Sequence, residues 1–172
     1  MSHKRSAAAV AALIALAALL LSACADKPLR LHIIANSNSE CDQQIKLSVR
    51  DAVLEATKDG ITKCKNEEEA KEYIEKNLGI IIATANETLA KDGAGYTADA
   101  ELGKSHFPEK SYGGVAYPEG DYEALKIRLG SGEGDNWWCV MFPPLCISEI
   151  SETDDYEYTS WFAELLSAIF GK

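Results

Sequence analysis

The stretch Gly130-Ser-Gly-Glu-Gly-Asp-Asn-Trp-Trp-Cys-Val-Met-Phe-Pro-Pro-Leu-Cys146 decides how this chain folds. Glycines alternate with other residues at its start, and glycine reaches backbone angles that other residues resist, so a tight turn is expected there. Trp137 to Phe142 is a strand-length run of apolar and aromatic residues. Pro143 and Pro144 lack the backbone N–H that a sheet requires, so the strand must end before them.

The side chains of this strand divide between two faces, because successive strand residues point in opposite directions. One face is expected to enter the core, and the other to leave a large aromatic side chain near solvent, as binding hot spots do. Burial of both tryptophans is the alternative. The predicted faces are Trp138, Val140 and Phe142 on one side, and Trp137, Cys139 and Met141 on the other.

The N-terminal half of the domain predicts a strand followed by helices. Residues 31–35 are apolar and β-branched, which favours a central strand. Ser39 with Asp42, and Asn66 with Glu69, have the spacing of helix N-terminal caps.

Apolar residues recur with a helical period after each of these caps. Asp59 and Gly60 are expected to end the first helix. Gly79 is expected to interrupt the second helix, leaving a third over residues 80–91.

The pattern then changes to alternation, which is typical of half-buried strands, over residues 96–102 and 123–129. One strand and helices followed by antiparallel strands predict an α+β fold, a two-layer sandwich with helices on one face of the sheet. Residues 30–148 form this predicted domain. Residues 149–172 are expected to be an acidic linker and an amphipathic helix, which either packs on the domain or docks on a partner or bilayer surface.

The N-terminus has the features of a bacterial export signal. Basic residues precede an uncharged stretch rich in alanine and leucine, so residues 1–23 are predicted to be a signal peptide. The stretch ends in Leu21-Ser-Ala-Cys24, which resembles a lipobox, so we expect Cys24 to be lipidated and residues 24–29 to be a tether. An ordinary secretory signal or an uncleaved anchor is the alternative.

Charge and composition exclude several functions. The 172 residues carry a formal net charge of −10, so binding to nucleic acid is not expected. Glu133 and Asp135 would repel phosphate from the glycine-rich turn, and a strand follows where a phosphate site needs a helix. The chain has neither a CxxC motif nor paired histidines, so no metal site is expected, and no cofactor is predicted.

Cysteines after position 24 are even in number, which suggests disulfides in an exported chain. We expect a bridge between Cys139 and Cys146, because a strand that turns at two prolines can bring them to bridging distance. Cys41 and Cys64 would be the second pair, although a helix of several turns separates them. The alternative for these two is a pair of free, buried thiols.

A hydrolase is the main catalytic alternative. Gly103-Lys-Ser105-His106-Phe is similar to a nucleophile elbow but lacks its closing glycine. His32 or His106 would serve as the base of a Ser-His-acid arrangement. A lipoprotein that binds a small ligand or a glycan through its tryptophans is a further alternative.

The motifs together resemble the stage II sporulation protein R family. The resemblance rests on Gly132 to Cys146, on the early Arg30-Leu-His-Ile-Ile-Ala-Asn-Ser-Asn-Ser39, on the helix around Arg50, and on Phe107-Pro-x-Lys-x-Tyr112. It covers roughly residues 30–148.

The resemblance implies a signal rather than a catalyst. Members of the family are made in the forespore and exported to the space between the two membranes. There they activate a membrane-embedded aspartic protease of the mother cell, the sigma-E processing peptidase, which cleaves pro-sigma-E. On this resemblance, Asn136, Trp137 and Trp138 are candidate partner-binding residues.

Overall fold

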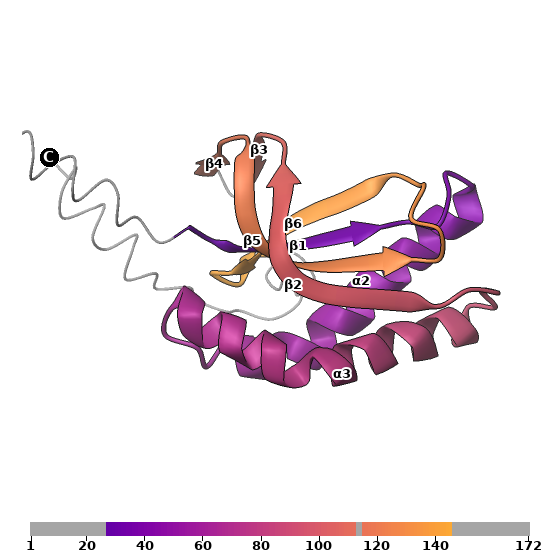
Figure 1. The fold of residues 1–172 in the computed structure, drawn as a ribbon, viewed down its shortest axis with the longest axis horizontal. Coiled ribbons are helices and arrows are strands. Elements are labelled where there is room, and N and C mark those ends of the chain that lie inside the picture. Colours follow the sequence, from indigo (N-terminus) through magenta and orange to yellow (C-terminus); the bar gives the residue numbers. More distant parts are fainter. Residues whose placement is uncertain (1–26, 113–114, 146–172) are drawn as a thin grey trace, which may run out of the picture.

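Within residues 27–112 and 115–145, which a computed structural model describes, the chain forms a four-stranded sheet, a two-stranded hairpin and two long helices (Figure 1). The mixed α+β class predicted from the sequence is confirmed. In chain order the elements are β1 (Leu29–Ile34), α2 (Glu40–Ile61), α3 (Glu67–Lys91), β2 (Ala98–Phe107), β3 (Lys110–Tyr112), β4 (Val115–Tyr117), β5 (Gly120–Leu129) and β6 (Asn136–Phe142).

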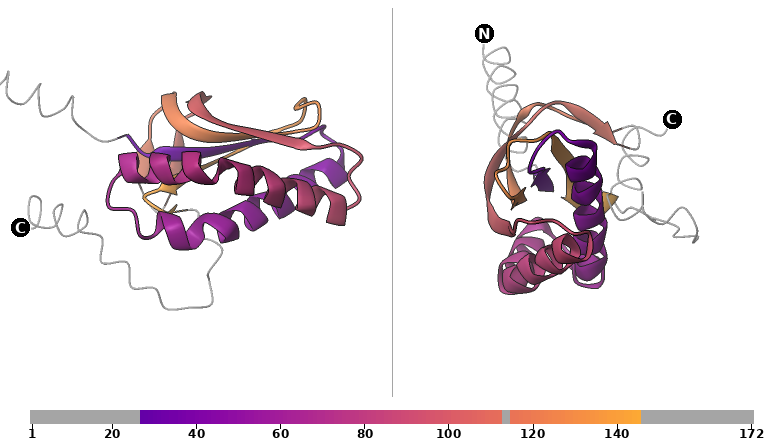
Figure 2. Two further views of the ribbon diagram at one scale, coloured as in Figure 1. Left: turned by 60° about the horizontal axis from the view of Figure 1, so that its bottom comes forward. Right: turned by 90° about the vertical axis from the view of Figure 1, so that its right-hand side faces the viewer.

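The sheet has the order β2-β5-β1-β6, so β2 and β6 are its edge strands. β1 runs parallel to β5 and antiparallel to β6, and β2 is antiparallel to β5. Both helices lie on one side of this sheet in the two views of Figure 2. The main core lies between the sheet and the two helices. Four strand residues in it are fully buried against helix residues: Leu31 and Ile33 of β1, and Leu125 and Ile127 of β5.

Both predicted helix starts are confirmed. The backbone N–H of Asp42 donates to Ser39 Oγ at 3.1 Å, which caps α2. The backbone N–H of Glu69 donates to Asn66 Oδ1 at 2.9 Å, which caps α3. The Glu69 carboxylate in turn accepts from the N–H of Lys65 at 2.9 Å. These contacts satisfy donors that a helix N-terminus otherwise leaves without partners.

The predicted break at Gly79 is wrong, and so is the separate helix over residues 80–91. α3 runs without interruption from Glu67 to Lys91. Ile74 and Ile81 on either side of the glycine are fully buried in the main core. Their burial outweighs the cost of about 1 kcal/mol that a glycine adds within a helix.

The prediction that Phe142 shares a face of β6 with Trp138 is wrong, because the strand contains a bulge. Leu29 pairs with Phe142 and Arg30 with Val140, so Met141 is an extra residue in the ladder. Phe142 consequently packs with the helix-side core, on the same side as Met141, instead of sharing a face with Trp138.

A second, smaller cluster lies on the sheet face away from the helices. It contains Phe107, Tyr122 and Ala124, with Trp138 packed against them. Figure 1 shows β2 and β5 bending together partway along their length, with the β3–β4 hairpin near their bent ends. This bend brings the end of β2 over the middle of the sheet, which matters for the site described below.

Several expectations fall outside the described residues: the signal peptide over 1–23, lipidation of Cys24, and the linker and helix over 149–172. β1 begins at Leu29, within the tether predicted for 24–29. Among the residues that the structure describes, neither helix has the length and apolar character needed to cross a membrane.

Candidate functional site

The glycine turn, residues 130–135, is built directly against the polar loop, residues 35–39. Asn36 Oδ1 accepts from the backbone N–H of Ser131 at 2.9 Å, and the Ser131 hydroxyl donates to the Asn36 carbonyl at 2.7 Å. Asn38 Oδ1 accepts from the N–H of Asp135 at 2.6 Å. Two of the stretches on which the resemblance rests therefore form one structural unit, which fixes where β6 begins.

Asp42, in the first turn of α2, holds the polar loop through hydrogen bonds. Its carboxylate accepts hydrogen bonds from the side chains of Asn36, Ser37 and Tyr96. These donors lower the pKa of Asp42 to about 2. Burial, together with the hydrogen bond to Asp42, raises the pKa of the Tyr96 phenol. Asp42 is therefore an ionised structural anchor.

His32 lies at the centre of the sheet face that the helices do not cover. Its Nδ1 is 2.8 Å from Ser105 Oγ, and its Nε2 is 2.8 Å from Asn136 Oδ1. The Asn136 oxygen can only accept, so Nε2 carries the proton and Nδ1 accepts from the Ser105 hydroxyl. Burial lowers the pKa of His32, in keeping with this neutral form.

This Ser105–His32–Asn136 arrangement has the chemical order of an activated nucleophile, a base and a group that orients the base. Its surroundings restrict access. His32 is only 8% exposed, the Trp138 ring stacks on it at 5.8 Å, and Phe107 meets it edge-on at 5.8 Å. The geometry therefore favours a polar connection that ties β1, β2 and β6 together.

Arg30 lies beside this cluster and is fully buried. Its Nε donates to the Cys139 carbonyl at 3.0 Å, while its two terminal nitrogens have no hydrogen-bond partner among the residues that the structure describes. Aromatic rings surround the guanidinium, and burial lowers its pKa. The ring centroids lie 4.3 Å (Phe107), 4.9 Å (Tyr122), 5.4 Å (Tyr117) and 5.7 Å (Tyr112) from the guanidinium carbon.

This aromatic cage connects the hairpin to the sheet. Tyr112 comes from β3 and Tyr117 from β4, and the Tyr112 hydroxyl also donates to the Trp138 carbonyl at 2.8 Å. Cation–π attraction is strong where water is excluded. Sequence reasoning missed this role of Arg30. The sequence feature that could have indicated this role is the presence of a charged residue, Arg30, among the apolar residues of β1.

The structure places the three candidate partner-binding residues together on β6, in different settings. The Asn136 side chain is occupied by His32. Trp137 and Trp138 are each half-buried, on opposite faces of the strand. Arg50 lies over the Trp137 ring at 4.4 Å, and Lys110 over the Trp138 ring at 6.0 Å. The expected division, with one ring in the core and the other near solvent, is replaced by partial exposure of both.

The cysteines correct one expectation. Cys41 and Cys64 are free thiols, so a bridge between them is wrong. Cys41 lies in the first turn of the 22-residue helix α2 and Cys64 lies just beyond its last residue, and the helix separates its two ends by about 33 Å. Cys139 is in a disulfide, and its predicted partner Cys146 lies outside the described residues, so that pairing stays a prediction.

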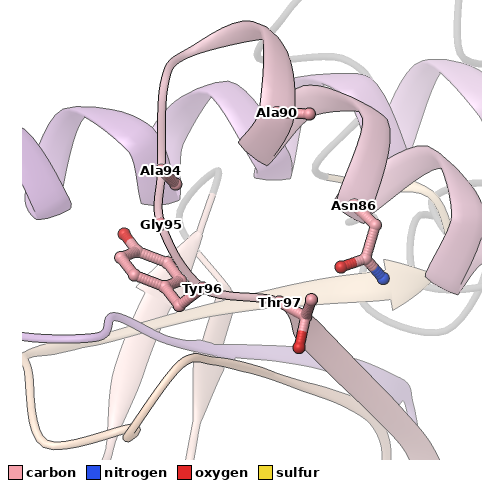
Figure 3. Close-up of a pocket in the computed structure, with 6 residues that line it drawn as sticks. All are labelled: Asn86, Ala90, Ala94, Gly95, Tyr96 and Thr97. Carbon is pink, nitrogen blue, oxygen red and sulfur yellow. The ribbon is translucent and has the colours of Figure 1, made fainter.

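In the described ranges, no group of three His, Cys, Asp or Glu side chains is placed to hold a metal ion. A shallow depression of about 440 Å³ lies between the end of α3 and the start of β2 (Figure 3). Asn86 lines it, and its carboxamide bonds to the backbone of Ala98. Tyr96 also lines it, and its hydroxyl is held by Asp42. These polar groups already have partners within the protein.

Two comparisons place the chain among known proteins. Residues 25–152 match the family model described as stage II sporulation protein R. The chain is also 45% identical over 126 residues to stage II sporulation protein R of Bacillus subtilis (strain 168), a match that covers 73% of this chain and 56% of the relative. The chain thus spans little more than half the length of that relative. No solved structure matches it.

Proposed function

Because this chain belongs to the stage II sporulation protein R family, we propose that it is an exported signalling protein of endospore formation. In this proposal it is made in the forespore and reaches the space between the forespore and mother-cell membranes. There it binds and activates the sigma-E processing peptidase, a membrane-embedded aspartic protease, and pro-sigma-E is cleaved. A lipid on Cys24 would tether the protein close to that membrane partner.

The placement of β6 is the observation that carries this proposal. β6 is an edge strand, and its two half-exposed tryptophans lie beside the cations of Arg50 and Lys110. Tryptophan and arginine are the residue types most enriched at binding hot spots. An activator must bind the active state of its target more tightly than the inactive state, and this surface is suited to such a contact.

Reconstitution of pro-sigma-E cleavage tests the proposal. The mature chain is exported in a non-sporulating host together with the membrane protease and pro-sigma-E, whose size is followed on a gel. Cleavage is expected only when this protein is present. Trp137→Ala should abolish it, while Ile80→Ala, at a 60% exposed position on α3, should not. No cleavage with a folded, exported wild-type chain would overturn the proposal.

A hydrolase remains the second candidate, because the structure brings Ser105, His32 and Asn136 into hydrogen-bonding contact. Ser105→Ala separates the two functions, since it removes the hydroxyl that is bonded to His32 with little change of volume. A hydrolase would release p-nitrophenolate from p-nitrophenyl acetate and lose that activity in Ser105→Ala. The signalling protein would keep its full activity in the cleavage assay. A glycan-binding lipoprotein is less favoured, because Arg50 and His32 already occupy a ring face of each tryptophan.

A further inference from the structure

We propose that the free edge of β2 accepts an extended segment of the protease as an additional strand, in which apolar side chains alternate with basic ones. The inference deepens the proposed function and rests on it, since it names a second contact with the same partner, in addition to the surface of β6. It concerns the backbone of residues 100–106, at the opposite edge of the sheet from the tryptophans.

The direction of the backbone groups along β2 follows from two observations. The Thr97 carbonyl accepts from the Gly130 N–H at 2.9 Å, so the odd-numbered residue points toward β5. Ala98, in contrast, directs both its N–H and its carbonyl toward Asn86 of α3. Because backbone groups alternate along a strand, even-numbered residues of β2 turn their N–H and carbonyl groups away from β5.

Asn86 already acts as one residue of a neighbouring strand. Its Oδ1 accepts from the Ala98 N–H at 2.9 Å, and its Nδ2 donates to the Ala98 carbonyl at 3.2 Å. These are the two bonds that an added antiparallel strand would make at this position. Further along the edge, four residues of β2 also turn their backbone N–H and carbonyl groups outward, namely Ala100, Leu102, Lys104 and His106. In the described part of the chain, these backbone groups have no hydrogen-bond partner.

The side chains beside this edge specify the partner's chemistry. Ala100 and Leu102 are half-buried and pack against the core on the helix side of the sheet, so the facing residues of an added strand should be apolar. Asp99 and Glu101 are exposed on the other side, where they form ion pairs with Arg128 and Lys126 of β5. Exposed pairs of this kind contribute little free energy, so both carboxylates can be shared with basic residues of an added strand. The net charge of −10 for the chain also favours a basic segment. This alternation is the pattern of strand addition to a sheet edge.

Two other arrangements fit less well. The edge of β6 is partly closed, because the Tyr112 hydroxyl occupies the outward carbonyl of Trp138. A second copy of this chain would bring two molecules of charge −10 together. A basic strand has the opposite charge and meets an edge that is open over several residues.

Hydrogen exchange on the full chain, alone and with the purified sigma-E processing peptidase in detergent, tests the inference. Fragmentation in the mass spectrometer resolves single amides. We expect the N–H groups of Leu102, Lys104 and His106 to exchange quickly in the free protein and at least about tenfold more slowly in the complex. The amides of Gly103 and Ser105, which face β5, should be protected in both states.

A matched pair of variants gives an independent readout. Lys104→Pro removes one outward N–H and leaves the β5 ladder intact, as edge strands allow. It should weaken capture by the protease at least about tenfold, while Lys104→Thr, which keeps the N–H and removes the charge, should bind normally. If Lys104→Pro fails to fold, the hydrogen-exchange experiment on the wild-type chain alone tests strand addition.

The outcomes separate the two proposals. A complex in which the even-numbered amides exchange as before, or a folded Lys104→Pro chain that binds like wild type, overturns strand addition alone. No complex with the wild-type chain overturns the proposed function and strand addition with it. Protection of these amides in a dimer of the free protein would show that a second copy occupies the edge, and would overturn the choice of partner.

Discussion

Gly134 and Ser37 are in such close contact that a Cβ on Gly134 would lie 2.3 Å from the Ser37 carbonyl oxygen. Neither atom belongs to a flexible side chain, so the contact leaves no room for adjustment. It joins the glycine turn to the polar loop, two stretches nearly a hundred residues apart in the sequence. The glycine is required here by space rather than by an unusual backbone angle, because its φ is not positive.

Gly134→Ala is therefore expected to destabilise the protein by about 1–3 kcal/mol, the usual cost of overpacking a site that cannot relax. Urea unfolding of the purified chain measures this. Gly103→Ala is the matched control, since a Cβ there would meet no atom within 4 Å. Equal stabilities for the two variants would contradict the close contact.

Gly79→Ala is expected to stabilise the protein by about 0.5–1 kcal/mol. Gly79 lies within α3, and a Cβ there would meet nothing within 4 Å. Alanine loses less backbone entropy than glycine when a helix forms. A higher melting temperature by calorimetry would support the continuous helix, whereas a lower one would indicate that the chain bends at this position.

Local features of the fold were accessible from the sequence, and distant ones were not. The caps at Ser39 and Asn66 depend on residues three positions away, so the spacing alone predicted them. The contact between His32 and Ser105 spans 73 residues and depends on the bend of β2 and β5, which alternation does not encode. The bulge that turns Phe142 toward the helices could not be predicted from alternation either. One extra residue in the strand reverses which face of the sheet the following side chain occupies.

Asp42 predicts a specific response to acid. Its folded-state pKa of about 2 lies below the ordinary value of 3.8, so the ionised form stabilises the fold at neutral pH. This stabilisation is present above about pH 4 and is lost as the pH falls toward about 2. Asp42→Asn should cost about 2 kcal/mol at pH 7 and progressively less below pH 4.

Urea unfolding at a series of pH values checks the Asp42 prediction. Asp59→Asn, at an exposed position of α2, serves as the control and should change stability by less than about 0.5 kcal/mol. A difference between wild type and Asp42→Asn that stays constant from pH 7 to pH 3 would contradict the assignment.

Arg30 predicts a requirement for a planar cation. Lysine at this position keeps the positive charge but loses both the stacking on Phe107 and the Nε bond to the Cys139 carbonyl. Arg30→Lys should therefore destabilise the protein by about 2 kcal/mol and increase hydrogen exchange in β3 and β4. Arg128→Lys, at an exposed ion pair with Asp99, should have little effect. Unchanged exchange in the hairpin would show that the cage does not hold it.

His32 predicts a loss of stability below neutral pH that the other histidine of the domain opposes. Burial and the nearby charge of Lys126 lower the pKa of His32. As the pH falls, His32 therefore takes up its proton in the unfolded chain before it does so in the folded chain. Stability from His32 is therefore complete above about pH 6.5 and falls as the pH drops toward its folded pKa. His106 has the opposite sign, because Asp121 and Glu119 raise its pKa.

Removing His106 should expose the effect of His32 alone. Because the raised pKa of His106 places its proton uptake in the folded state above about pH 6.5, the wild type gains stability there as the pH falls, and His106→Ala should not. Between about pH 6.5 and pH 5, where most carboxylates stay ionised, the unfolding free energy of His106→Ala should fall through His32. Ser105→Ala should lower stability by about 1–2 kcal/mol at pH 8, because it leaves Nδ1 of His32 buried without a donor. A flat profile in His106→Ala would mean that His32 takes up its proton in the folded state as readily as in water.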